Sequence, residues 1–107
     1  MPTMPLRGEV WVVDLGMVAK IRPALVLSIS AVDANDRSLV TIVPHTTSVR
    51  GSRFEVNVPV KFLKAGAFDA QNLLTIPTVK LVRLLGKLTD EQLQQVEHVV
   101  QLWLGFR

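Results

Sequence analysis

The stretch EVWVVDLGMVAKIRPALVLS, residues 9–28, holds two apolar runs separated by a short loop. Residues 9–15 are rich in Val and Trp and are followed by Gly16, and residues 23–30 form a second, almost continuous apolar run. Runs of this length and composition, rich in β-branched and aromatic residues and bounded by glycine, are typical of β-strands. The sequence therefore predicts two strands, 9–15 and 23–30, early in the chain.

The chain continues with strand-like segments beyond this pair. A polar turn at 33–38 leads into a third predicted strand, 39–46, and Pro44 places the end of that strand at a sheet edge or a bulge. Residues 53–60 alternate between apolar and polar side chains, as a half-buried strand does. A further strand is expected within 72–85, where a proline interrupts it.

The last segment is predicted to be an amphipathic helix that begins after Thr89. Thr89 and Gln92 have the spacing of a capping box, and two acidic residues occupy the first turn, where the helix dipole favours negative charge. One apolar stripe follows, made of Leu93, Val96, Val100, Trp103 and Leu104. Several short strands and one C-terminal helix predict a mainly β protein, folded as a small, strongly bent barrel in a single domain, residues 1–107.

Composition limits the classes of protein that fit. The chain has 107 residues, 49% of them hydrophobic, and a mean hydropathy of +0.34, which is high for a small soluble monomer. No apolar run approaches the ~20 residues that a membrane-spanning helix needs, and the N-terminus lacks the apolar core of a secretory signal. We therefore expect no membrane partner and a homodimer that buries part of the apolar surface.

Cysteine, histidine and charge narrow the chemistry further. The chain has no cysteine, which excludes disulfides and thiolate catalysis and favours a cytoplasmic location. Its two histidines, His45 and His98, are far apart, and its acidic residues are scattered, so we expect neither a metal site nor a cofactor. Residues 1–88 carry eleven Lys and Arg against six acids, a net charge of +5 that suits a polyanionic partner.

Lys20 and Arg22 stand beside Pro23 at the entrance of the second strand. Proline pushes the residue before it into an extended conformation, so Arg22 is held at a strand mouth, where its guanidinium suits a carboxylate or a phosphate. The alternative is a flanking charge that only keeps an apolar strand soluble.

A second polar cluster follows the third strand. The hydroxyls of Thr46, Thr47 and Ser48 precede Arg50 and Arg53 in a glycine-containing turn. Hydroxyls, loop amides and arginines together can cradle a phosphate, although an ordinary polar hairpin loop has the same composition. Together with Lys20 and Arg22, these groups are candidates for contacts to a polyanion at one mouth of the barrel.

The order of these motifs resembles the MazF/PemK-type toxin endoribonucleases. The segments that carry the resemblance are RGEVWVVDL, KIRPALVLS, VPHTT, RFEV, FDAQN and LLGKLTDEQLQQVEHVVQLWLGF, which together run from Arg7 to Phe106. The resemblance implies an SH3-like barrel of the PemK/CcdB type that works as a homodimer. It also implies metal-independent, sequence-specific cleavage of single-stranded RNA, with 2′,3′-cyclic phosphate and 5′-hydroxyl ends. Neutralisation by an antitoxin with an acidic disordered tail is implied as well.

The resemblance assigns roles to individual residues. It places the key arginine at Arg22, the key threonine at Thr46 and an RNA-binding glutamine at Gln71. RNA supplies its own nucleophile, the 2′-hydroxyl, so such a protein needs only to orient the backbone and stabilise charge on phosphorus. Arg22 suits charge stabilisation, and Thr46 suits a hydrogen bond to a phosphate oxygen or to the 2′-hydroxyl. His45 is a weaker candidate, because strand alternation turns it away from Thr46 and favours a buried histidine.

One departure from the family pattern keeps other functions open. Many members carry a longer loop before the Arg-Pro, with a carboxylate, whereas residues 16–22 here are short and hold no acid. Asp14, Glu55 and Asp69 are weak substitutes for that carboxylate. The alternatives are a CcdB-like poison that binds DNA gyrase through its C-terminal helix, and an inactive relative that binds RNA or antitoxin without cutting.

Overall fold

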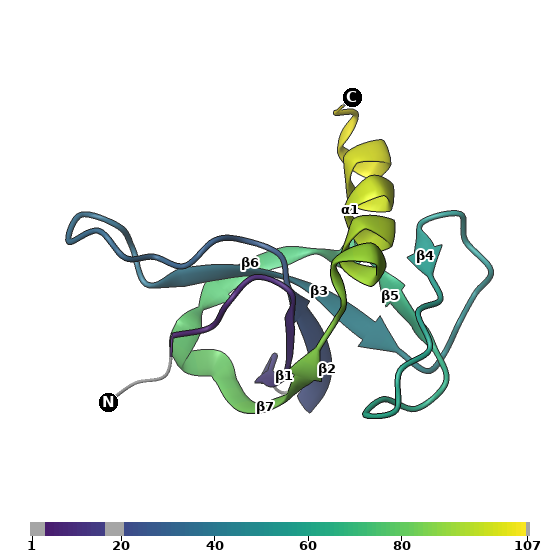
Figure 1. Ribbon diagram of the computed structural model, residues 1–107, viewed down its shortest axis with the longest axis horizontal. Helices are drawn as coiled ribbons and strands as arrows, with labels where there is room; N and C mark the ends of the chain where they lie inside the picture. The colour runs from purple at the N-terminus through teal and green to yellow at the C-terminus, as the bar shows by residue number, and fades with distance from the viewer. Residues whose placement is uncertain (1–3, 17–20, 107) are drawn as a thin grey trace.

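The computed structural model describes residues 4–16 and 21–106. Seven strands, two short 3-10 helices and one α-helix make up the described chain (Figure 1). In chain order these are β1 (Glu9–Asp14), β2 (Ile21–Val26), β3 (Leu39–Thr46), β4 (Glu55–Val56), β5 (Ala67–Asp69), η1 (Ala70–Asn72), β6 (Leu74–Pro77), η2 (Thr78–Lys80), β7 (Leu81–Lys87) and α1 (Asp90–Leu104). The mainly β fold with a C-terminal helix is therefore confirmed.

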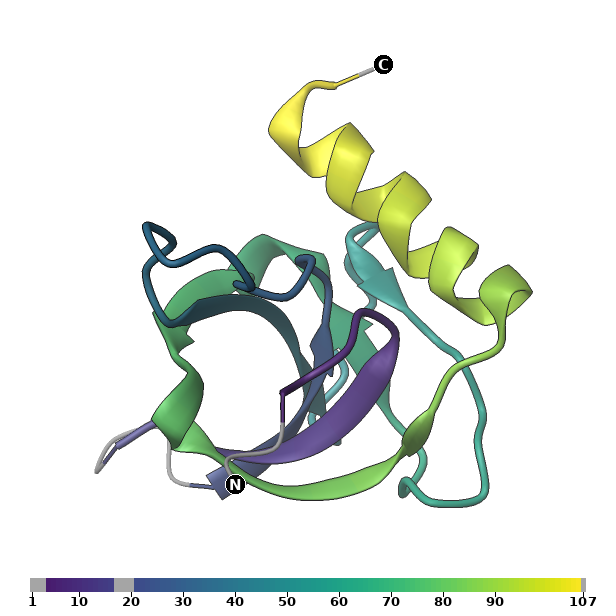
Figure 2. The same cartoon turned by 60° about the vertical axis from the view of Figure 1, so that its left-hand side comes forward.

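The strands form one sheet that curls on itself. Its order is β4-β5-β3-β2-β1-β7, and β6 pairs with β3 beside this path. All the pairings are antiparallel. Within the described chain no pairing joins β6 to β7, so the barrel is open at that seam, and Figure 2 shows the curled sheet with α1 outside it.

The core lies on both faces of this curved sheet. Neighbouring residues of the central strands point to opposite sides, so both Val10 and Trp11 are buried, as are Ala24 and Leu25. One cluster, inside the curl, includes Trp11, Val13, Ala24, Val26, Val40, Ile42 and Ile76. The other, under α1, includes Val10, Leu25, Val43, Phe54, Val56, Phe68, Val96 and Val100.

Two strands end well before the sequence predicts, and β1 ends one residue early, at Asp14. The second predicted strand, 23–30, ends at Val26, because the carbonyl oxygen of Thr41 accepts from the backbone N–H groups of both Leu27 and Ser28 and the regular ladder stops there. The predicted strand 53–60 pairs only at Glu55–Val56, since its partner β5 has three residues. The predicted alternation still holds, because Phe54, Val56 and Val58 are all buried.

Helix α1 begins as the sequence predicts. The Thr89 hydroxyl accepts from the Gln92 N–H at 3.2 Å, and the Gln92 side chain accepts from the Thr89 N–H at 2.9 Å, which completes the capping box. Val96 and Val100 are buried against the sheet, while His98 is exposed. Trp103 is 40% exposed and meets the Phe54 ring edge to face at 5.2 Å. No helix in the described part of the chain is long and apolar enough to cross a membrane.

Candidate functional site

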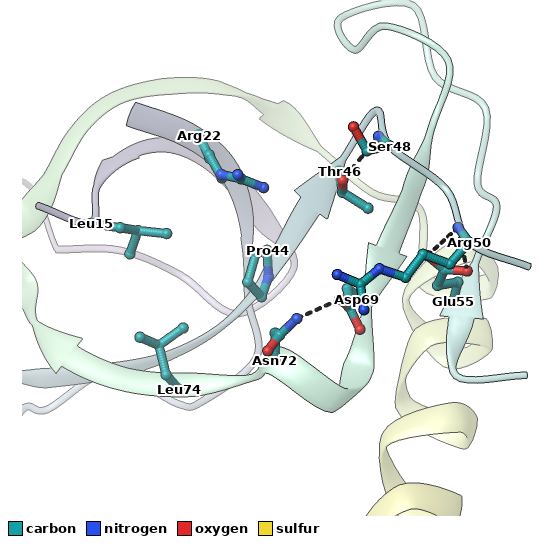
Figure 3. A pocket seen from close by; sticks show the side chains of 10 residues that line it. All are labelled: Leu15, Arg22, Pro44, Thr46, Ser48, Arg50, Glu55, Asp69, Asn72 and Leu74. Carbon is teal, nitrogen blue, oxygen red and sulfur yellow. Dashed lines mark hydrogen bonds between the residues drawn. The ribbon is translucent and has the colours of Figure 1, made fainter. Parts of the chain in front are cut away.

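Arg22 and Thr46 line one pocket at the mouth of the barrel (Figure 3). Arg22 lies in the first part of β2, opposite Val13 of β1, and Thr46 is the last residue of β3. The pocket has a volume of about 440 Å³ and is also lined by Leu15, Pro44, Ser48, Arg50, Glu55, Asp69, Asn72 and Leu74. Groups far apart in the sequence, from β2, the end of β3 and the following loop, thus meet on one hollow.

The pocket opens where β3 changes its partner. On one side of β3, residues 39–42 pair with β6 and residues 45–46 pair with β5, so Pro44 lies opposite the gap between these two strands. Proline has no N–H to donate to a neighbouring strand. On the side of the gap, no strand of the described chain pairs with Pro44, so no carbonyl group is left without its hydrogen-bond donor. The turn η1 spans this gap and brings Asp69 and Asn72 to the pocket.

The Thr46 hydroxyl has a defined orientation. Its oxygen accepts from the Ser48 N–H at 3.0 Å, so one lone pair is used and the hydroxyl hydrogen remains available to donate. The backbone of Gly66 packs closely against that of Thr46. Only glycine allows this approach, because a Cβ at position 66 would lie 2.1 Å from the Thr46 carbonyl oxygen. Thr46 is therefore arranged as a hydrogen-bond donor toward a ligand in the pocket.

The Glu55 carboxylate organises the loop that carries Arg50. It accepts from the Arg50 N–H at 3.1 and 3.0 Å and from the Ser52 N–H at 2.7 Å. These backbone hydrogen bonds, first that from Arg50, hold the pKa of the Glu55 carboxyl below its usual value. A carboxylate stabilised in this way is a weak base, so Glu55 suits a structural role better than proton transfer.

The other two candidate carboxylates are also engaged. Asp69 caps η1 by accepting from the Gln71 N–H at 3.2 Å, and its second oxygen accepts from the side-chain Nδ2 of Asn72 at 2.6 Å. Asp14 accepts from the Gly16 N–H at 3.0 Å and lies outside this pocket. Both carboxylates therefore act as acceptors for neighbouring groups of the chain.

A second hollow of about 510 Å³ lies on the other side of Arg22 and Thr46. These two residues and Ser48 line both hollows, so they stand at the junction. The second hollow adds two cations, Lys64 and Arg83, and none of the described residues that line it is acidic. A chain of phosphates crossing the junction would meet positive charge on this side.

His45 borders the second hollow but is buried. Its side chain is 5% exposed and meets the Phe68 ring edge to face at 5.0 Å. Burial lowers the pKa of His45 from its usual value of 6.5, so the imidazole is neutral near pH 7. Strand alternation predicted this burial, and Thr46 lies on the opposite face of β3.

Comparison with known proteins places this arrangement in a family. The model of the PemK-like, MazF-like toxins of type II toxin–antitoxin systems matches residues 6–104. The chain belongs to this family. The match includes β1 to β7 and α1, and with them all of the described residues that line the pocket of Figure 3.

Individual family members agree with this assignment. The probable endoribonuclease MazF5 of Mycobacterium tuberculosis is 29% identical over 101 residues, covering 90% of this chain and 89% of the relative. A mycobacterial endoribonuclease in complex with its cognate antitoxin is 26% identical, with a TM-score of 0.77 over 96% of this chain and 95% of that one. MazF in the MazE–MazF crystal structure from Deinococcus radiodurans has a TM-score of 0.82 at 23% identity, over 99% of this chain and 100% of that one, which supports the fold alone.

The structure separates the RNA-binding residues predicted from the sequence into groups. Ser48 and Arg50 line the first pocket, and Thr47 and Ser48 line the second hollow. Arg53 lies outside both, with its guanidinium 4.6 Å from the centre of the Phe54 ring. Gln71 is exposed on η1 and lines neither.

Lys20, the remaining predicted contact, lies outside the described residues. Sequence reasoning missed Asn72, Lys64 and Arg83, which do line the hollows. Of these only Asn72 had a signal, since it directly follows the predicted Gln71. Across residues 4–16 and 21–106, no three His, Cys, Asp or Glu side chains gather as a metal site would require.

Proposed function

We propose that this MazF-like protein is an endoribonuclease that cleaves single-stranded RNA without a metal ion. The observation that carries the proposal is the meeting of Arg22 and Thr46 at the junction of two hollows, one of them lined by further cations. A guanidinium at this point can bind two phosphate oxygens, and the cations beside it can hold the flanking backbone. The names of the endoribonuclease relatives support the same activity.

The reaction needs no nucleophile from the protein. The RNA 2′-oxygen attacks the adjacent phosphorus, a P–O2′ bond forms, and the P–O5′ bond breaks, leaving a 2′,3′-cyclic phosphate and a 5′-hydroxyl. Arg22 stabilises the negative charge that grows on the phosphoryl oxygens, and the Thr46 hydroxyl donates to one of them. Solvent water takes the 2′-hydroxyl proton and returns one to the 5′-oxygen, because Glu55 and Asp69 are committed to donors of the chain.

The partners follow from charge and exposed apolar surface. An antitoxin with an acidic disordered tail would compete with RNA for the same cations, and a relative is known in complex with its cognate antitoxin. A homodimer would cover apolar side chains that remain exposed, such as Leu84, Val82 and Phe106. We place the complex in the cytoplasm, where RNA is available.

The test is an RNA cleavage assay in EDTA with end-group analysis of the products. We expect cutting by the wild type with cyclic phosphate ends, a loss of at least about 100-fold for Arg22→Ala, and a loss of about 10-fold or more for Thr46→Ala. Thr46→Ser keeps the hydroxyl and should retain most of the activity. Arg37→Ala removes an exposed arginine outside both hollows and serves as the matched control.

One result would overturn the nuclease activity and another the assignment of Arg22 to the site. Intact RNA with folded wild-type protein, across varied substrates, would favour a protein-binding poison or an inactive RNA-binding relative. Unfolding of Arg22→Ala would show that Arg22 is structural. Circular dichroism of each variant beside the assay separates these results from a loss of chemistry.

A further inference from the structure

The Asn72 side chain, in the pocket of Figure 3, has only one possible orientation. Its Nδ2 lies 2.6 Å from the Asp69 carboxylate, and an ionised carboxylate can only accept hydrogen bonds. The amino group must therefore face Asp69, and the Asn72 carbonyl oxygen is turned away from it as an acceptor. Asp69 is held in turn, because its other oxygen caps η1 through the Gln71 N–H.

The remaining polar groups of the pocket fall into two classes. Arg22 and Arg50 are donors whose charge matches phosphate oxygens. Asp69 and Glu55 already accept hydrogen bonds from the chain but keep further lone pairs, and with the oriented Asn72 they present acceptors to the pocket. Three apolar side chains, Leu15, Pro44 and Leu74, supply surface on which the face of a base could rest.

Resting on the proposed RNA cleavage, we infer that this pocket reads one base of the RNA and selects a base with an amino group over uracil. Cytosine, adenine and guanine each carry an amino donor that these acceptors can bind. Uracil carries the carbonyl oxygen O4 where cytosine carries its amino group, and this oxygen would face the acceptors of Asp69 and Asn72 without a hydrogen. The N3–H of uracil is a single donor between two carbonyl oxygens, so any acceptor that binds it also faces those oxygens. A site that loses its hydrogen bonds in this way discriminates strongly against the wrong ligand.

The matched probes are cytidine and uridine monophosphate, which have the same ring and sugar. We would titrate each into the full-length protein and follow the Asn72 side-chain amide by ¹⁵N NMR. We expect cytidine monophosphate to bind about tenfold more tightly than uridine monophosphate. Guanosine against inosine monophosphate, which lacks only the 2-amino group, gives the same comparison for a purine.

The informative variant is Asp69→Asn. Asparagine caps a helix start about as well as aspartate, so η1 is retained. Its amide can donate as well as accept, which releases the orientation of Asn72 and lets the pair serve the uracil carbonyls. We expect the ratio of the two dissociation constants, uridine over cytidine monophosphate, to fall close to one. Asp33→Asn is the control, because Asp33 also accepts from the N–H two residues on, at 2.9 Å, but lies in an exposed turn outside the pocket.

Equal binding of the two pyrimidine nucleotides by the wild type, or an unchanged preference in Asp69→Asn, would overturn the inference. Absence of any nucleotide-dependent shift at Asn72 would do so as well. The measurement does not depend on cutting, so its failure is separable from that of the nuclease proposal. Base preference without RNA cleavage would retire only the nuclease, and cleavage without base preference would retire only the base-reading pocket.

Discussion

At the scale of single residues, the protonation of His45 is linked to folding. Burial against Phe68 lowers the pKa of His45 in the folded protein, so the unfolded chain binds that proton more readily. The contribution of neutral His45 to the free energy of unfolding is therefore complete above pH 6.5. It falls as the pH drops below 6.5, because the unfolded chain then gains a proton that the folded protein resists. We expect urea unfolding of the wild type to show a lower midpoint at pH 5.5 than at pH 7.5.

The comparison that isolates His45 is His45→Leu, which fills the same space with an apolar side chain. This variant should lose much less stability between the two pH values, because no proton can enter at position 45. An identical fall in both proteins would assign the acid sensitivity to other groups. Activity near pH 7 is expected to survive in His45→Leu, since the neutral, buried imidazole has no part in the proposed chemistry.

Sequence reasoning located the residues of the site that lie on regular strands. Period-two alternation separated His45 from Thr46, and the Arg-Pro pair marked Arg22, because strand geometry fixes where such side chains point. It chose Gln71 where the structure brings Asn72 to the pocket. These residues belong to a 3-10 turn that breaks the strand period, so periodicity could not show which of the two faces inward.

At the scale of elements, the sequence predicted the start of the helix better than the ends of the strands. The start of α1 was predictable because a capping box depends on residues three apart. The ends of β2 and β4 were not, since a strand stops where its partner stops, and β5 offers only three residues to β4. Pro77 correctly marked the break between β6 and the segment that leads to β7.

The loop between β3 and β4 gives the prediction at this scale. The Glu55 carboxylate accepts the N–H groups of Arg50 and Ser52, so Glu55→Ala should free the loop and misplace the Arg50 guanidinium. We expect a higher KM for RNA with a smaller change in kcat, and faster hydrogen exchange at the Arg50 and Ser52 amides. Glu55→Gln keeps one acceptor oxygen and should be intermediate.

Unchanged exchange at both amides in Glu55→Ala would show that the loop is held by other contacts. A lost kcat with an unchanged KM would instead point to Glu55 in the chemical step. The pKa of Glu55 is lowered in the folded protein, so its hydrogen bonds are retained above pH 4.5 and are lost as the pH falls through the lowered value. The protection factors of the Arg50 and Ser52 amides, which correct for the intrinsic effect of pH on exchange, should therefore fall at acid pH in the wild type and stay insensitive to pH in Glu55→Ala.

At the scale of the whole molecule, a bent sheet with one outer helix was predictable from the count and type of elements. The pairing of β3 with three partners was not, because contacts between distant segments leave no local pattern. This pairing creates the gap at Pro44 and therefore the pocket itself. The segments that supply the candidate site were visible in the sequence, while the hollow that they share depends on the strand topology.

The final prediction concerns Arg7, which ties three distant segments together. Its guanidinium donates to the Leu27 carbonyl beyond β2 and forms an ion pair with Glu97 of α1. The side chains of Arg7 and Glu97 are each about two-thirds buried. Neighbouring Gly8 donates to Val26 and accepts from the Leu88 N–H, so the N-terminal segment lies between the sheet and the helix. Arg7 therefore connects the sheet to the helix through its side chain.

Arg7→Ala should lower the free energy of unfolding by about 2 kcal/mol, because a charge-assisted hydrogen bond to Leu27 is lost along with the ion pair. Glu97→Gln removes only the ion pair and should cost below about 1 kcal/mol. Urea unfolding of both single variants and the double variant measures the coupling, with exposed Gln94→Ala on the same helix as the control. Equal losses of stability in Glu97→Gln and Arg7→Ala would mean that the ion pair alone accounts for the effect of Arg7. The hydrogen bond to the Leu27 carbonyl would then contribute nothing measurable.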